Sequence, residues 1–299
     1  MPHLARAQKD AFWRDGYLLV EDVADPGLLA VLRRDFSAWV DESRSRSVPW
    51  GETIDGRPRF DLELKDHGPG HPALRRVNSP TEVSDAYRRA MAASKMTGIV
   101  AELIGPNVKF HHSKINSKLA GAGTEVKWHQ DFAFTPHSND NIVTALLFID
   151  EVTADNGPLE IVAGTHRGEI HSLWHGDTFT AAVSEEVAAR SRRSAVRCLG
   201  PAGACCFMHT RLLHGSAPNH SDHPRTLFIA VYTAEDAVPL SPNPVPSSME
   251  GMVVAGERTG KVRSIDFELR LPQLPRTASF FDQQATAAAG AGAGKDYTF

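Results

Sequence analysis

The chain has 299 residues, is 41% hydrophobic and carries a formal net charge of −4. The apolar fraction suffices for one large core or two modest ones, and no run of roughly five or six like charges points to nucleic acid as a partner. No stretch approaches the ~20 consecutive apolar residues that a membrane span requires, so no membrane association is expected.

The N-terminus and the cysteines suggest the compartment. The first residues, MPHLARAQKDAFWRDGYLLV, lack the apolar segment of a signal peptide. Cys198, Cys205 and Cys206 form no C-x-x-C pair, which favours buried thiols in a reducing compartment. A cytoplasmic protein is expected, and basic dipeptides such as Arg75-Arg76 are expected to lie on solvated faces.

The first third of the chain has mainly helical patterns. Apolar spacing predicts a helix over 5–18 that ends near Asp15-Gly16, then a short strand in YLLVEDV. Asp25-Pro26 begins a second helix that continues through LLAVLRRDFSAWVDES. Residues 45–80, rich in Pro, Gly, Asp and His, predict a long irregular loop. Residues 81–104 predict a third helix that ends at Gly105-Pro106.

Short β-rich segments follow. They are NVKFHHSKINSKL, IVTALLFIDEV, PLEIVAG, AVRCLG, GACCFMH and RTLFIAVYTA, each bounded by turn-forming residues. This order predicts one domain over 1–284, an antiparallel double-sheet barrel at about 106–240 with helices packed on one face. Residues 180–194 predict a short helix, and the Ala/Gly-rich 285–299 predict a flexible C-terminal tail.

The string WHQDF, with a histidine further along the chain, predicts a metal site. His129 and Asp131 are two residues apart and share one side of an extended chain, and His214 supplies a second imidazole. Two imidazoles and a carboxylate suit non-haem Fe(II), which needs open positions, although a zinc hydrolase also uses three protein ligands. Arg225, 11 positions after His214, favours the iron chemistry because a guanidinium binds a carboxylate bidentately.

His209 is an alternative distal ligand. We favour His214 because Gly215 permits close approach of the backbone. His209 is then expected in the core or behind the ligands, and His166 is expected to be structural.

A second set of candidates lies on one predicted strand. His112, Lys114, Asn116 and Lys118 alternate and so share a face. If that face points inward, the four side chains line a pocket; if it points outward, they are ordinary surface.

The segment from about 108 to 234 resembles the phytanoyl-CoA dioxygenase (PhyH) family of Fe(II)/2-oxoglutarate oxygenases. The resemblance rests on SKLAGAGTEVKWHQD, DNGPLEIVAGTHR and HTRLLHGSAPNHSDHPRTLFIAVY, and the run from HHSKIN to WHQDF is also similar to ectoine hydroxylase members. It implies a mainly β fold with helices, a double-stranded β-helix (jelly-roll, cupin-like barrel) with an N-terminal helical layer.

The resemblance also implies roles for individual residues. His129, Asp131 and His214 would bind Fe(II). The co-substrate 2-oxoglutarate would be held through its distal carboxylate by Arg225 and Ser216, with Lys118 and Gln130 nearby, and O₂ would be the oxidant. Asp131 is intact, whereas halogenating relatives replace this carboxylate, so hydroxylation or a related oxidation of a small molecule is expected, with release of succinate and CO₂.

The substrate is less defined. Candidate substrate contacts are His112, Lys114, Asn116, Phe132, Phe134 and Arg211. Lys114, Lys127 and Arg211 hint at an anionic group on the substrate, and segments 45–80 and 168–196 are expected to form a mobile cover. The oligomeric state stays open, with a homodimer as one option. Two alternatives are a non-catalytic metal- and ligand-binding barrel and a cupin-like hydrolase or isomerase; neither requires Arg225.

Overall fold

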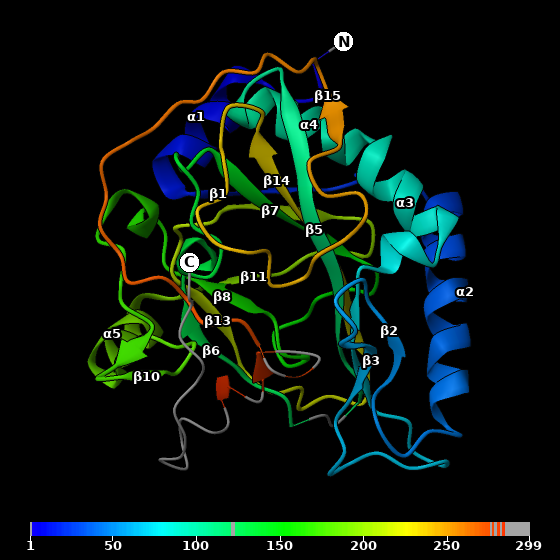
Figure 1. The fold of residues 1–299 in the computed structure, drawn as a ribbon. Coiled ribbons are helices and arrows are strands. Elements are labelled where there is room, and N and C mark those ends of the chain that lie inside the picture. The colour runs from blue at the N-terminus through cyan, green and yellow to red at the C-terminus, as the bar shows by residue number, and fades with distance from the viewer. Residues whose placement is uncertain (1, 121–122, 276, 278–279, 282, 285–299) are drawn as a thin grey trace.

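Two antiparallel sheets dominate the computed structural model, which describes residues 2–120, 123–275, 277, 280–281 and 283–284 (Figure 1). The larger sheet has nine strands in the order β1 (Tyr17–Val20), β12 (Cys205–His209), β7 (Ile142–Phe148), β14 (Arg225–Ala234), β5 (Val108–Lys118), β4 (Leu74–Asn78), β3 (Pro58–Leu62) and β2 (Trp50–Glu52), with β15 (Val253–Ala255) also on β5. The smaller sheet runs β11 (Val196–Cys198), β8 (Leu159–Ile161), β13 (His214–Ser216) and β6 (Val126–His129). The expected double-stranded β-helix is confirmed.

The helices cover the outer face of the larger sheet. They are α1 (Arg6–Asp15), α2 (Pro26–Ser43), α3 (Asp85–Ala92) and α4 (Lys95–Ile104), and the chain ends its helical layer where β5 begins (Figure 1). Residues alternate along β12: Phe207 belongs to the core beneath the helices, whereas Met208 belongs to the core between the sheets. The period of two along a strand therefore builds both cores from one segment.

The predicted third helix is interrupted. A 3-10 turn, η1 (Pro80–Glu82), precedes α3, and Ala93 leaves the helical conformation between α3 and α4. The side chain of Ser84 accepts a hydrogen bond from the backbone N–H of Tyr87, and that of Ser94 accepts one from the backbone N–H of Met96. Serine at these N-cap positions starts two short helices where apolar spacing alone predicted one.

The prediction of an irregular loop over 45–80 was wrong. The segment contains β2, β3 and β4, and Val77 of β4 pairs with Ile115 of β5, so it extends the larger sheet. Phe60 and Val77 are buried in the core beneath α2. The Pro and Gly residues mark the turns between strands that are too short to show a clear alternation.

The remaining elements lie between β8 and β11 or at turns. Between these two strands lie a two-stranded hairpin, β9 (Trp174–His175) and β10 (Thr178–Phe179), and helix α5 (Glu185–Ser194). Helix α5 falls within residues 180–194, where a short helix was predicted. Two further 3-10 turns are η2 (Asp131–Ala133) and η3 (Thr165–Arg167). Within the described chain, no helix is long and apolar enough to cross a bilayer. The tail at 285–299 falls outside the described residues.

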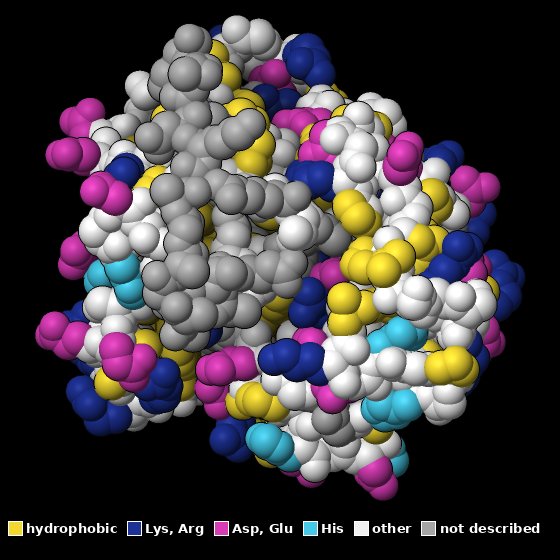
Figure 2. Space-filling view, turned by 60° about the horizontal axis from the view of Figure 1, so that its bottom comes forward, with side chains coloured by type: hydrophobic (Ala, Val, Ile, Leu, Met, Phe, Trp, Pro, Cys, Tyr) yellow, Lys and Arg dark blue, Asp and Glu magenta, His cyan; other side chains and the backbone are white. Residues whose placement is uncertain are grey.

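Acidic and basic side chains are interspersed over the face shown in Figure 2.

The three cysteines are free and buried, Cys205 and Cys206 on β12 and Cys198 on β11, as expected for thiols inside sheets.

Candidate active site

Three side chains meet where the smaller sheet opens toward the larger one. His129 ends β6, Asp131 begins η2, and His214 begins β13 directly opposite His129 in the strand register. One donor atom from each of the three lies within 4.8 Å of the others. The Oδ1 atom of Asp131 is 3.4 Å from Nε2 of His129 and 3.6 Å from Nε2 of His214.

Backbone carbonyl groups orient the two imidazoles. Nδ1 of His129 lies 2.7 Å from the carbonyl of Lys127, and Nδ1 of His214 lies 2.9 Å from that of Leu212. A carbonyl only accepts, so each Nδ1 carries the hydrogen and each Nε2 presents its lone pair to the centre. Burial lowers the pKa of His214 to about 4, which keeps this imidazole in its neutral, ligating form.

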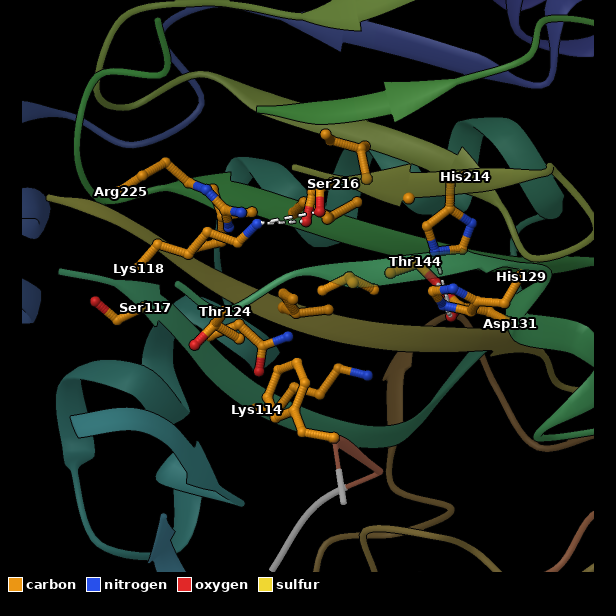
Figure 3. A pocket seen from close by; sticks show the side chains of 18 of the residues that line it. Lys114, Ser117, Lys118, Thr124, His129, Asp131, Thr144, His214, Ser216 and Arg225 are labelled. Atoms are coloured by element: carbon orange, nitrogen blue, oxygen red, sulfur yellow. Dashed lines mark hydrogen bonds and ion pairs between the residues drawn. The ribbon is translucent and has the colours of Figure 1, made fainter. Parts of the chain in front are cut away.

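Thr144 fixes the carboxylate from the opposite sheet. Its Oγ1 donates to Oδ2 of Asp131 at 2.7 Å, which leaves Oδ1 facing the histidines (Figure 3). Burial alone would raise the pKa of Asp131, but His214, His129 and Lys114 together hold it well below its usual value. Sequence reasoning missed Thr144; the available signal is a threonine inside the otherwise apolar strand IVTALLF. Two imidazoles and an ionised carboxylate fit a ferrous ion.

Arg225 stands at the other end of the same cavity. It begins β14 opposite Lys118, the last residue of β5, and it is buried. Its Nε and Nη2 both donate to the carbonyl of Gly157, at 3.0 and 2.7 Å. Gly157 has φ +77°, and a Cβ there would lie 2.7 Å from the carbonyl of Ala217, so only glycine fits this turn. Burial lowers the pKa of Arg225 to about 10, and the guanidinium remains charged at neutral pH.

Lys118 and Ser216 complete that end. The Lys118 Nζ donates to Ser216 Oγ at 2.8 Å and to the carbonyls of Ser216 and Ala217 (Figure 3). Burial, and then the charge of Arg225, lowers the pKa of Lys118 to about 6. The result is a buried basic pocket with a hydroxyl group, which suits a carboxylate.

Two cavities adjoin at the metal cluster. The first, of about 610 Å³, extends from His129, Asp131 and His214 to Arg225 and lies between the sheets, because residues of both line it. Its further walls include Lys114, Asn116, Thr124, Leu146, Leu159 and Met208. The second, of about 480 Å³, is lined by Arg76, His112, Lys114, His129, Asp131, Phe134, Thr135, Val231, Pro244, Val245, Pro275 and Phe280. The β5 face with His112, Lys114, Asn116 and Lys118 thus points inward.

Arg76 is a pocket residue that sequence reasoning placed on the surface. It is only 3% exposed and lines the second cavity from β4. Its Nε donates to Oδ1 of Asn78 at 2.7 Å, while its Nη1 is buried and has no hydrogen-bond partner among the described residues. Burial lowers the pKa of Arg76 to about 10 and that of neighbouring Lys114 to about 8.

Phe280 also belongs to the site and was not expected there. Its ring lies 5.9 Å from that of His129 and 5.7 Å from that of Phe134. The segment is tied to β6 by Gln284, whose backbone carbonyl accepts from Lys127 Nζ at 2.6 Å. Phe280 lines both cavities.

Three predicted contacts lie elsewhere, since none of them lines either cavity. The Gln130 amide donates to the backbone carbonyls of Glu169 and Arg211, at 3.1 and 2.6 Å. Arg211 pairs with Asp140 at 2.9 Å. Phe132 is fully buried and packs on Phe267, with ring centroids 5.1 Å apart. Local sequence spacing did not reveal that the chain turns these side chains away from the metal cluster.

His209 and His166 lie together, buried beneath α1 and away from the metal cluster. Their ring centroids are 5.1 Å apart, and His209 also packs on Phe12 and Trp13 of α1. Neither belongs to the cluster of possible metal ligands.

This fold and donor set define the class of non-haem iron oxygenases. Residues 12–227 match the model of the phytanoyl-CoA dioxygenase (PhyH) family, and the chain belongs to that family. It is a 2-oxoglutarate-dependent dioxygenase whose cofactors are Fe(II) and 2-oxoglutarate. Membership of this family favours an oxygenase over a metal-dependent hydrolase.

Several known proteins are similar. A probable alpha-ketoglutarate-dependent hypophosphite dioxygenase of Stutzerimonas stutzeri is 34% identical over 212 residues, 70% of this chain and 74% of that protein. An L-proline trans-4-hydroxylase of Streptomyces griseoviridis is 27% identical over 255 residues, 78% and 88% of the two chains. The crystal structure of EctD from S. alaskensis with 2-oxoglutarate and 5-hydroxyectoine has a TM-score of 0.65 at 22% identity, covering 90% of this chain and 89% of that one.

Proposed function

We propose that the protein hydroxylates, or otherwise oxidises, an unactivated C–H bond of a small molecule while 2-oxoglutarate is converted to succinate and CO₂. The observation that carries this proposal is the position of the metal cluster between two adjoining cavities, one of which ends in Arg225, Lys118 and Ser216. The co-substrate and the substrate can then each reach the metal cluster from its own cavity.

The residues have separate tasks. His129, Asp131 and His214 hold the iron, and Arg225 and Ser216 hold the distal carboxylate of 2-oxoglutarate with Lys118 beside it. When bound, the iron and 2-oxoglutarate supply the oxidising chemistry that transfers an oxygen atom from O₂ to the substrate. The apolar walls formed by Leu146, Leu159 and Met208 exclude water.

The substrate occupies the second cavity in this proposal. Among the predicted contacts, His112, Lys114 and Phe134 line that cavity, whereas Asn116 lines the first. The relatives are named for hypophosphite, L-proline and ectoine, so family membership leaves the substrate open.

A visible absorption band tests the site. Protein with Fe(II) and 2-oxoglutarate under anaerobic conditions is expected to show a weak metal-to-ligand charge-transfer band. His129→Ala, Asp131→Ala and His214→Ala are each expected to abolish it, and His209→Ala, which removes a buried histidine outside the cluster, is the matched control. Loss of the band in the control with retention in His214→Ala would overturn the ligand assignment. Substrate-stimulated succinate formation across a panel of small molecules then tests turnover.

Arg225 is expected to set the affinity for the co-substrate. Truncating one member of a buried carboxylate–guanidinium pair costs roughly 2–5 kcal/mol, so Arg225→Ala should raise the 2-oxoglutarate concentration needed by about tenfold or more. Fe(II) binding should persist, and Arg225→Lys should recover only part because lysine lacks the planar fork. Titration of the visible band with 2-oxoglutarate measures both effects; an unchanged requirement in Arg225→Ala would contradict the proposal.

A further inference from the structure

We propose that the second cavity is a binding site for an anionic substrate, in which Arg76 and Lys114 receive a carboxylate or a phosphorus or sulfur oxyanion and the apolar wall takes a short organic body. This inference rests on the proposed function, because it assigns a substrate class to the same site.

The two cations converge on one space. Arg76 reaches the cavity from β4 and Lys114 from β5, two neighbouring strands of the larger sheet. The Arg76 guanidinium carbon lies 5.4 Å from the centroid of the Phe280 ring, and the Lys114 Nζ lies 5.8 Å from the same centroid. Both groups line the same cavity, and the charge of Arg76 lowers the pKa of Lys114, so one anion can contact both.

Neither cation makes a close ion pair with the described residues that line this cavity. Across the described parts of the chain, no ion pair within 4.0 Å involves Arg76 or Lys114. Asp61 attracts Arg76 electrostatically, but the cation that it contacts, at 2.7 Å, is Arg75, which also pairs with Glu63 at 3.1 Å. Asp131 attracts Lys114 but belongs to the metal cluster.

The charges of iron and 2-oxoglutarate would be offset at the metal cluster and at the Arg225 end of the first cavity. A ferrous ion offsets Asp131 and the carboxylate of 2-oxoglutarate that would bind at the metal. The distal carboxylate offsets Arg225. At the second cavity, no carboxylate of the described residues lies within ion-pair distance of Arg76 or Lys114, and a buried cation without a contacting partner is unfavourable. The buried Nη1 of Arg76, which lacks a hydrogen-bond partner among the described residues, is an N–H donor ready for such an anion.

The rest of the cavity lining favours a particular polarity of the substrate. Phe134, Val231, Val245 and two prolines, Pro244 and Pro275, line the cavity. These walls favour a compact apolar body attached to the anionic group.

Matched probes test the inference. Butanoate, butane-1-sulfonate and butylphosphonate share one alkyl chain with different anionic groups, and butanamide and butan-1-ol are the neutral counterparts. Each is titrated by calorimetry into anaerobic protein with Fe(II) and 2-oxoglutarate. We expect at least one anion to bind about tenfold or more tightly than both neutral compounds, because hydrogen bonds to charged groups are the stronger ones. The preferred anion distinguishes the carboxylate from the phosphorus and sulfur oxyanions.

Variants then locate the binding. Arg76→Gln and Lys114→Gln are each expected to weaken the preferred anion by about tenfold or more, and Arg76→Lys to weaken it less. Arg89→Gln, on the exposed face of α3, is the matched control and should leave anion binding unchanged. If a melting curve shows that Arg76→Gln is unfolded, Lys114→Gln and Arg76→Lys decide.

Three results would overturn the inference: equal binding of neutral and anionic probes, no binding of any of the three anions, or unchanged anion affinity in the folded variants. The visible band separates this failure from failure of the proposed function. A wild-type protein that never forms the band contradicts the iron and 2-oxoglutarate site, whereas a normal band without anion preference contradicts only the anionic substrate.

Discussion

Thr144 is the clearest case of a single side chain that supports the metal ligands without belonging to them. Thr144→Val keeps the shape of the side chain but removes the hydrogen bond to Oδ2 of Asp131. We expect Fe(II) affinity to fall by about 10- to 100-fold, the usual effect of losing a partner behind a metal ligand. Thr144→Ser should retain most of it. Metal titration of the visible band measures the change, and wild-type affinity in Thr144→Val would show that Asp131 is held by other means.

The lowered pKa of Lys118 predicts that binding of 2-oxoglutarate takes up a proton in a pH-dependent way. In the free protein its pKa is lowered to about 6, so the amine is mostly neutral at pH 7.5. A bound carboxylate favours the charged amine and raises that pKa, so 2-oxoglutarate binding should take up a proton at pH 7.5 and progressively less as pH falls below 6, where the amine is already charged. Calorimetry in buffers of different ionisation enthalpy measures the uptake. Lys118→Met should lose it, and equal uptake in that variant would assign the proton to another group.

The sequence predicted those site residues whose signal is local. His129 and Asp131 share one strand end, and the Arg225 spacing relative to His214 is read within one segment. Arg76, Thr144 and Phe280 were missed because strand pairing or chain crossing brings them to the site: Arg76 is beside Asn116 in the register, and Thr144 is beside Val231. Such neighbours are set by the tertiary fold and leave no short motif.

Among the elements, length decided what could be predicted. The long strands β5, β7 and β14 show clear β-rich patterns over 7 to 11 residues. The ligand-bearing strands β6 and β13 have 4 and 3 residues, too few to show an alternation, and β2, β3 and β4 were hidden within a Pro/Gly-rich segment. The serine caps that divide the third predicted helix were also missed, because its apolar spacing is the stronger pattern in the sequence.

The mobile cover predicted for 45–80 needs revision, because β3 and β4 are paired within the larger sheet. We expect slow amide hydrogen exchange in both strands even without ligands, since their N–H groups are engaged in a multi-strand ladder. Segment 168–184, with only the short β9–β10 hairpin, should exchange faster and become protected when Fe(II), 2-oxoglutarate and a bound anion are present. Hydrogen exchange with mass spectrometry compares the two states; rapid exchange in β3 and β4 would restore the original prediction.

At the scale of the whole molecule, the larger sheet separates a structural core from the reaction space. Phe207 is fully buried under the helices, and its neighbour Met208 lines the first cavity. Phe207→Ala should lower the free energy of unfolding by about 3–5 kcal/mol and leave the 2-oxoglutarate affinity of the folded protein unchanged. Met208→Ala should alter that affinity as well. Denaturant unfolding and titration of the visible band measure the two quantities; a changed co-substrate affinity in Phe207→Ala would show that the cores are coupled.

Strand β5 carries residues for both reactants at fixed steps. Lys118 stands at the co-substrate end and His112 at the other cavity, six positions away, or roughly 20 Å along an extended strand. If the proposed function holds, a change at position 112, or at Arg76 on the next strand, should therefore alter what is oxidised without disturbing the end proposed to accept 2-oxoglutarate. A single-residue insertion between them would instead turn one whole group to the opposite face. Directed evolution of new substrate preferences should accordingly accumulate substitutions toward the start of this strand and tolerate no change in its length.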